Sequence, residues 1–365
     1  MSIRRLRVGI TSAGGDMVPS AIVALRKNQQ IAFDIHAFNA AFHPVSSHLA
    51  DRFDILPAGD SPDYVSEVIR HVKENDIEVF LPWSDEEALA LAHARDALND
   101  VGCIAMVSPP VIMNTITDKA KTYDILKKAG LKVPEYTVAN SVEDIRSALK
   151  AYGYPRRTVV VKPATGRGGR GVKILLGEDD PADWLGRGRR EQRLNNIGAH
   201  NSDIFDFGSD DSAVDDSAVD DSAGQTRGSY LVMPCLNAPV YDVDIFRFPG
   251  SETKCFVRER GNPTGIPFTG NILRKDPEVE EYAHHIADVL NLQSLHDIDM
   301  MTDANLGPVL LEINPRPSGS LAGLSAAGFA LLDYALASVA GIQLDIKSVE
   351  KDVEILTYTE SVALS

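Results

Sequence analysis

The sequence has few cysteines and no long apolar run. Its three cysteines, Cys103, Cys235 and Cys255, are widely spaced, so they form neither a CxxC metal motif nor a disulfide framework. We therefore expect a reducing compartment and a cytoplasmic location. No stretch of 18 apolar residues occurs, which argues against a transmembrane helix. The basic start, MSIRRLR, is not followed by an apolar segment, so we expect no secretory signal.

Positive charge is also scarce. The chain has 36 Lys and Arg against 52 Asp and Glu, a net charge of −16. This balance argues against non-specific binding to nucleic acid or to an anionic membrane. Hydrophobic residues make up 44% of the 365 residues, which is enough for two or three globular domains with cores of their own.

Several common catalytic motifs are missing. No GxxxxGK[ST] occurs, which excludes a P-loop NTPase, and no GxSxG marks a hydrolase nucleophile. TSAGGD, after the first predicted strand, lacks the third glycine of a dinucleotide fingerprint, so an NAD-dependent oxidoreductase is a minor alternative. DFG at 206–208 has no HRD partner, which argues against a kinase. The nine histidines show no ligand spacing, and we expect packing or surface roles for them.

The first 110 or so residues alternate strand and helix patterns. This alternation predicts a parallel sheet with helices on both faces, a small Rossmann-like domain. Strands are expected at 7–11, 31–38, 77–83 and 103–107, and helices from about 17, at 62–76 and at 85–98.

After about residue 117 the pattern changes to paired strands mixed with helices. A helix is expected over 118–129, ended by Gly130. The fold class is therefore α/β plus α+β. Further strands are expected within 158–176 and at 229–235, 240–248, 253–260, 295–301 and 308–316, with a helix at about 277–290.

One segment, about 196–228, is of low complexity. DDSAV or DDSAG occurs three times in succession between residues 210 and 224. Such a composition cannot bury enough apolar area to offset the entropy of ordering, so we expect a disordered insertion. Clustered Asp also suits Ca²⁺, but a solvated acidic loop is the simpler interpretation.

The segment TGRGGRG matches GxGxxG at Gly166, Gly168 and Gly171. Because a β-patterned stretch follows it, the loop joins two strands and is not a Rossmann turn. Glycine lets backbone N–H groups approach phosphate oxygens closely, and Lys162 at the end of the preceding strand could reach a phosphate. A tight hairpin with a surface lysine is the alternative. Lys119 alone is uninformative.

PVLLEINPR is more informative. Alternation places Leu310, Glu312 and Asn314 on one strand face, and Leu311 and Ile313 on the other. A hairpin turn at about 305–306 would set Asp299 opposite or next to Glu312. Two carboxylates that close repel unless a cation lies between them, and Asn314 adds an oxygen, which suits Mg²⁺. Arg316 follows and could hold an anion. A surface hairpin with ordinary acids is the alternative.

Together these segments resemble the ATP-grasp superfamily, most closely the carbamoyl-phosphate-synthase-like and biotin-carboxylase-like branch of carboxylate–amine ligases. The resemblance covers nearly the whole chain: LPWSDEEALALA, TDKAKTYDILKKAGLKVPEY, VVVKPATGRGGRGV, YLVMPCLNAPVYDVDIF and LLEINPRPSGS. It implies a Rossmann-like pre-ATP-grasp domain at 1–115, a mobile lid subdomain at 116–236 and a C-terminal subdomain with a metal site at 237–365.

The resemblance also implies site residues. Asp299, Glu312 and Asn314 would bind Mg²⁺, with Mn²⁺ as an option, and Arg316 with Arg258 would stabilise developing charge; Arg260 shares the face of Arg258. A set of residues would bind ATP: Lys119, Lys162, Gly166, Gly168, Gly169, Met233, Cys235, Leu236 and Asp242.

The hinge departs from the family pattern. Met233 and Pro234 stand where an acidic residue is usual, so adenine pairing would use the Cys235 carbonyl and the Leu236 N–H, because Pro234 has no N–H. Val240 stands at the position of the ribose-binding Glu, and Asp242 could substitute for it.

The implied activity is ATP-dependent ligation. A small-molecule carboxylate would be activated as an acyl phosphate and joined to an amine, releasing ADP and phosphate. The alternatives are a ligase that phosphorylates bicarbonate or carbamate, and a nucleotide-binding regulatory protein without turnover. Nucleic-acid and membrane partners are not expected, and a homodimer is one option for the assembly.

Overall fold

The computed structural model describes residues 4–15, 17–166, 169–179, 192–194, 228–261, 270–358 and 360–361. The predicted insertion at about 196–228 therefore lies almost wholly outside the described residues, as do Gly168 and the DFG triplet. Within the described parts, no helix combines the length and the apolar character needed to cross a membrane.

The N-terminal part is the predicted parallel sheet with helices on both faces. Its strand order is β3-β2-β1-β4-β5, and every pairing is parallel. The strands are β1 (Arg4–Ile10), β2 (Ile31–Asn39), β3 (Arg52–Ile55), β4 (Val79–Leu81) and β5 (Ile104–Ala105). The helices are α1 (Val18–Arg26), α2 (Pro44–Leu49), α3 (Tyr64–Asn75), α4 (Asp85–His93), α5 (Arg95–Asp100) and α6 (Pro110–Ile116).

Local signals explain where two of these helices lie. Asp76 ends α3 in the left-handed conformation (φ 49°). Ser84 begins α4 with a capping box: its side chain accepts from the Glu87 N–H while the Glu87 carboxylate accepts from the Ser84 N–H. The single helix predicted at 85–98 is instead two, because the backbone leaves the helical region at Ala94 (φ −99°, ψ 6°).

A second sheet carries the glycine loop. Its order is β6-β10-β7-β8-β9, and β7 pairs with β8 antiparallel, as expected for a loop between two strands. The Asp118 side chain caps α7 at the Lys121 N–H, and Gly130 follows the helix at φ +84°. The elements are α7 (Lys119–Lys128), β6 (Thr137–Ala139), α8 (Val142–Ala151), β7 (Val159–Pro163), β8 (Lys173–Leu175), β9 (Gln192–Leu194) and β10 (Tyr230–Pro234).

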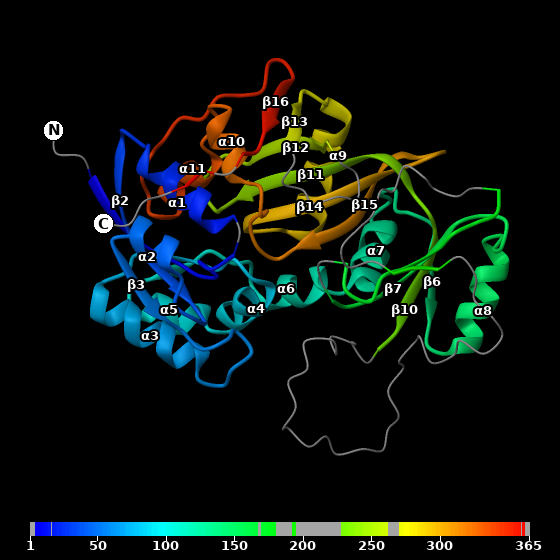
Figure 1. Cartoon of the computed structure of the whole chain (residues 1–365), viewed down its shortest axis with the longest axis horizontal. Coiled ribbons are helices and arrows are strands. Elements are labelled where there is room, and N and C mark those ends of the chain that lie inside the picture. Colours follow the sequence, from blue (N-terminus) through cyan, green and yellow to red (C-terminus); the bar gives the residue numbers. More distant parts are fainter. Residues whose placement is uncertain are drawn as a thin grey trace.

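The third sheet is antiparallel, with the order β15-β14-β11-β12-β13-β16. Its strands are β11 (Asn237–Arg247), β12 (Lys254–Arg260), β13 (Gly270–Arg274), β14 (Ser294–Asp303), β15 (Gly307–Asn314) and β16 (Val353–Leu356). The helices of this part are α9 (Pro277–Leu290), α10 (Ala322–Ala326) and α11 (Leu331–Val339). In Figure 1 this sheet lies between the N-terminal elements and the second sheet.

The β14–β15 hairpin confirms one expectation and corrects another. Asp299 pairs directly with Glu312, as predicted. A register shift between Asp299 and Met300 pairs Met300 with Leu310, which leaves Leu311 as an extra residue. Leu310 therefore packs in the same core cluster as Ile313, and the prediction that Leu310 shares a face with Glu312 was wrong.

The three sheets are joined by shared cores. One cluster combines α3 and α4 of the N-terminal part with α7, α9 and one face of the third sheet. A second combines β1 and α1 with α10, α11 and the apolar end of the other face. Since about 25 cal/mol is gained per Å² of apolar surface buried, these shared clusters hold the N-terminal part against the C-terminal sheet. The polar remainder of that second face is where charged side chains collect.

Candidate active site

One face of the third sheet carries a row of charged side chains across four neighbouring strands. Side chains alternate between faces along a strand, so residues two apart share a face. The register sets Asp242 opposite Asp299 and Arg258, and Asp297 opposite Asp244 and Asn314. The opposite face holds apolar residues that pack with α9. The row comprises Arg258, Arg260, Asp242, Asp244, Asp297, Asp299, Glu312 and Asn314.

Three of these carboxylates form a tight buried cluster. Oxygens of Asp242, Asp297 and Asp299 lie within 4.8 Å of one another. Burial raises the pKa of Asp297 well above its usual value, and Asp299, Asp242 and Asp244 add to the rise. Burial, with Asp242 and Glu312, raises the pKa of Asp299 to about 7 against the opposing Arg260. One oxygen each of Asp242 and Asp297 is buried without a hydrogen-bond partner.

These observations fit a divalent cation. Buried polar atoms normally find partners, and crowded carboxylates are stabilised by a cation between them. Carboxylate oxygens are the preferred ligands of Mg²⁺. Asp242, the residue that the sequence suggested for the ribose, belongs to this carboxylate cluster, where it accepts a hydrogen bond from Arg260 (Nε to Oδ1, 2.8 Å). The cause is the β11–β14 register, which no local pattern specifies.

Glu312 is held differently from its neighbours. Its Oε2 lies 3.2 Å from Nζ of Lys119, which also donates to the carbonyl of Gly166 in the glycine loop (2.8 Å). Burial works against ionisation of Glu312, but Lys119 and Lys162 bring its pKa below the usual value. The first lysine of the nucleotide-binding resemblance thus connects the second sheet's loop to the acidic strand.

Lys162 points to the same strand from β7. Its Nζ donates to the Leu311 carbonyl at 3.1 Å and lies 3.3 Å from the Tyr123 hydroxyl. Burial and the neighbouring Lys119 together lower the pKa of Lys162 to about 7, although Glu312 and Asp299 act in the opposite direction. An incoming anion would oppose that shift, because a negative charge favours the ammonium form.

The two arginines of β12 in this row, Arg258 and Arg260, differ in how deeply they are buried. Arg258 has no exposed surface and bonds Asp244 (2.7 Å) and Ser320, so it fills a structural position. The side chain of Arg260 is 20% exposed and contacts both Asp242 and Asp299 (3.0 Å). The sequence left open whether Arg258 or Arg260 faces the substrate, and Arg260 is the more exposed of the two.

Arg316 lies between two parts of the chain. It contacts Asp297 (3.6 Å), the Asn314 side-chain oxygen (3.3 Å) and Asp85 at the start of α4 (3.2 Å). Asn314 also donates to Asp297 at 3.1 Å. The N-terminal part thus supplies a carboxylate that holds Arg316 at the edge of the site.

The glycine loop and the hinge complete the candidate nucleotide site. Gly166 (φ 116°) and Gly169 (φ 73°) adopt backbone conformations that favour glycine, whereas Gly168 lies outside the described residues. Met233 and Leu236 are buried with Val309 in a small apolar cluster, which suits a flat apolar ring. The Cys235 N–H donates to the Thr158 carbonyl and is therefore occupied by the fold.

Two carboxylates of the site, Asp297 and Asp85, were not predicted from the sequence. Asp297 lies two residues before Asp299, and alternation alone would have placed both on one face. Asp85 is more than 200 residues from Arg316, and no local signal connects them.

Two family models match the chain. One, described as "ATP-grasp in the biosynthetic pathway with Ter operon", matches residues 226–361. The other, described as "Sugar-transfer associated ATP-grasp", matches residues 103–210. Both descriptions are of ATP-grasp families, and the two matched segments lie one after the other along the chain. Both matched segments carry residues of the site: Lys119 and Lys162 in one, and Asp299, Glu312 and Asn314 in the other.

Two further likenesses extend over most of the chain. A carbamoyl phosphate synthase large chain from Methanothermobacter thermautotrophicus is 25% identical over 93% of this chain and 31% of its own. N5-carboxyaminoimidazole ribonucleotide synthetase, solved with ADP, matches 97% of this chain and 82% of its own at TM-score 0.66 and 17% identity.

A third likeness is to a biotin carboxylase domain dimer of 2-oxoglutarate carboxylase from Hydrogenobacter thermophilus, solved with MgADP, ADP and bicarbonate. It matches 93% of this chain and 70% of its own at TM-score 0.64 and 16% identity. These structures confirm the expected fold class. The chain spans less than a third of the length of the curated relatives it matches.

Proposed function

We propose that this ATP-grasp protein is an ATP-dependent ligase that activates a small-molecule carboxylate as an acyl phosphate and joins it to an amine. The contact between Lys119 and Glu312 carries the proposal. It brings a phosphate-binding lysine and a metal-binding carboxylate from separate sheets to one place, with Lys162 beside them. Phosphoryl transfer requires positioning and charge neutralisation more than a protein nucleophile, and this arrangement supplies both.

Each group has a proposed role. Lys119, Lys162 and the backbone N–H groups near Gly166 and Gly169 would hold the phosphates of ATP. Met233 and Leu236 would contact the adenine, with the Cys235 carbonyl as its polar partner. Arg260 and Arg316 would stabilise charge that develops on the transferred phosphoryl group.

Mg²⁺ would be held by Asp299, Glu312 and Asn314, together with Asp242 and Asp297, which have unpartnered oxygens in the same cluster. Bound there, the cation would neutralise charge on the phosphate oxygens. Lys119 would then exchange part of its contact with Glu312 for a phosphate, because both anions compete for one ammonium group.

A second candidate is phosphorylation of bicarbonate or carbamate. Two of the likenesses favour it: the carbamoyl phosphate synthase relatives, and the biotin carboxylase domain that was solved with bicarbonate. A third candidate is a nucleotide-binding regulatory protein without turnover. Retention of both lysines and of the acidic row in one buried site weighs against it.

Location and assembly are also proposals. We place the enzyme in the cytoplasm, because Cys103, Cys235 and Cys255 form no disulfide with one another. A homodimer is proposed by analogy with the biotin carboxylase domain dimer, and sedimentation at several protein concentrations tests it.

The deciding experiment measures ADP release with ATP, Mg²⁺ and a panel of carboxylates, each with and without amines. Stimulation only by a carboxylate and amine together supports ligation, and product mass identifies the amide. Stimulation by bicarbonate alone, lost in bicarbonate-depleted buffer, supports the second candidate. If calorimetry detects ATP binding but no condition gives ADP release, the result supports the third candidate, a nucleotide-binding regulatory protein without turnover.

A further inference from the structure

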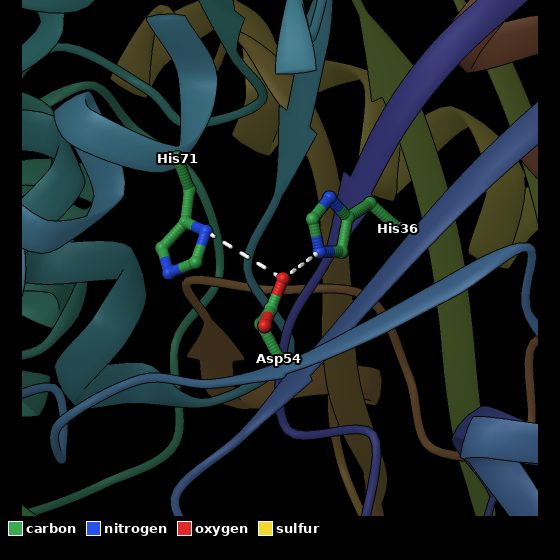
Figure 2. Close-up of side chains that lie close together, drawn as sticks. All are labelled: His36, Asp54 and His71. Atoms are coloured by element: carbon green, nitrogen blue, oxygen red, sulfur yellow. Dashed lines mark hydrogen bonds and ion pairs between the residues drawn. The ribbon is translucent and has the colours of Figure 1, made fainter. Parts of the chain in front are cut away.

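A second group of potential metal ligands lies in the N-terminal part, away from the carboxylate cluster. His36 is on β2, Asp54 on the neighbouring edge strand β3, and His71 on α3 (Figure 2). The parallel register pairs Phe38 with Asp54, so His36 and Asp54 extend from the same face of the sheet. That face is covered by α3, which brings His71 to them.

The three side chains converge on one point. Nε2 of His36 lies 2.7 Å from Oδ2 of Asp54, and Nδ1 of His71 lies 3.7 Å from the same oxygen. All three potential ligand atoms lie within 4.8 Å of one another. Figure 2 shows both rings turned toward the Asp54 carboxylate from opposite sides.

The rings have the properties of ligands. His36 is 3% exposed and His71 is 5% exposed. Nδ1 of His71 faces the carboxylate yet is buried without a hydrogen-bond partner. Burial lowers the pKa of both histidines, which favours the neutral imidazole that can bind a metal.

A buried His–Asp pair could serve packing alone, and His36 does stack on Phe38 (4.1 Å between ring centroids). The ring of His71 packs edge-on against Phe38 (5.1 Å between centroids), but this packing does not explain why its Nδ1 is aimed at the same oxygen, too far away for a hydrogen bond. A shared central position between two imidazoles and a carboxylate is the arrangement that a metal ion would occupy.

We propose that His36, Asp54 and His71 bind one divalent transition-metal ion of the zinc class, with water completing its coordination. Imidazole nitrogen favours Zn²⁺ over Mg²⁺, so this site would not compete for the cation of the carboxylate cluster. Two changes would accompany binding. The Asp54 side chain, 48% exposed, would move outward, because 2.7 Å is shorter than the spacing between two ligands of one ion.

The second change is the loss of the contact between Arg70 and His71. The Arg70 guanidinium lies 2.8 Å from Nε2 of His71 and is held by Glu67 and Glu74. A metal on Nδ1 requires the proton on Nε2, which an arginine donor opposes. Arg70 therefore weakens the site, and its removal should strengthen it. A bound ion would tie edge strand β3 to α3.

The test uses the full chain with any purification tag removed and excess Mg²⁺ present to occupy the carboxylate cluster. Zn²⁺ is titrated by calorimetry, and Co²⁺ reports imidazole ligation through its visible absorption. We expect one site whose affinity falls at least about tenfold in Asp54→Asn and His71→Gln. His93→Gln, a change of an exposed histidine, is the matched control and should bind like the parent.

Arg70→Gln should bind Zn²⁺ more tightly than the parent. Because Asp54 is half exposed, Asp54→Asn keeps the test valid even if a histidine variant does not fold. Equal Zn²⁺ affinity in the parent, Asp54→Asn and His71→Gln, or no Co²⁺ spectrum in the parent, would overturn the proposal. Neither result depends on ADP release, so it is independent of the proposed ligase activity.

Discussion

Two buried carboxylate sites in this molecule have opposite character. Glu87, in the N-terminal part, directs one oxygen to the hydroxyls of Thr11 (2.6 Å) and Ser12 (2.8 Å) and to the N–H of Ser84 (3.0 Å). The cluster of Asp242, Asp297 and Asp299 instead places like charges together and leaves buried oxygens without partners.

The difference indicates what each site does. A buried acid whose bonds are all to nearby neutral groups is explained by folding, since it closes a helix cap and joins β1 to α4. Acids that crowd one another destabilise the fold unless a ligand arrives, and such groups concentrate at functional sites. Four predictions test this contrast, beginning with the largest effect.

Glu312→Gln should reduce turnover by at least about 100-fold, because the substitution keeps the shape but removes the charge that would hold the metal near the phosphates. The affinity for ATP should fall much less, since Lys119 and Lys162 remain. ADP release as a function of Mg²⁺ concentration measures the effect. Turnover within a few-fold of the parent would remove Glu312 from the metal site.

Lys162→Met should weaken ATP binding by about 10- to 100-fold, because a charge-assisted bond to phosphate contributes about 1.5–3 kcal/mol. Melting temperature should be unchanged or higher, since the substitution removes a buried charge whose pKa is lowered to about 7. Calorimetric titration with ATP gives the affinity. The matched control is Lys173→Met on β8, another buried lysine outside the proposed contacts. Equal loss in both variants would contradict a specific role.

The stabilisation by Mg²⁺ should increase with pH around neutrality. Asp299 has its pKa raised to about 7, so the metal-free native state binds a proton that the unfolded state has lost. That proton stabilises the native state at low pH, and this stability is lost as pH rises through about 7. Mg²⁺ binds the ionised form and should restore it.

Thermal melts with and without Mg²⁺ at about pH 6 and about pH 8 test this pH dependence. The shift caused by Mg²⁺ should be larger at the higher pH. Asp299→Asn should reduce both the shift and its pH dependence. An identical Mg²⁺ shift at both pH values in the parent would argue against a metal at the cluster.

The smallest effect is expected at the satisfied site. Glu87→Gln keeps the shape of the side chain but replaces a charged acceptor, and we expect a loss of about 1–2 kcal/mol in the free energy of unfolding. The loss should not depend on Mg²⁺, in contrast to Asp299→Asn. Urea unfolding with and without Mg²⁺ measures it, and a Mg²⁺-dependent loss would erase the distinction between the two carboxylate sites.

The sequence alone predicted the parts that depend on local chemistry. Gly130 predicted the end of α7, and the turn-rich residues between β14 and β15 predicted that Asp299 would lie opposite or next to Glu312. The alternation of strand and helix patterns predicted the parallel sheet. Each of these features depends on the order of a few neighbouring residues, so a short segment of sequence is enough to predict it.

The tertiary structure decided which charged groups meet. The β11–β14 register placed Asp242 opposite Asp299 in the carboxylate cluster, and packing buried Arg258 more deeply than Arg260. Asp85 reached Arg316 across the chain, and His36 and His71 met at Asp54 although their spacing predicted nothing. Such contacts between charged side chains depend on how whole sheets and helices pack. The packing is stabilised mainly by burial of apolar residues in the shared cores, so the sequence around a charged residue does not show which partner it will meet.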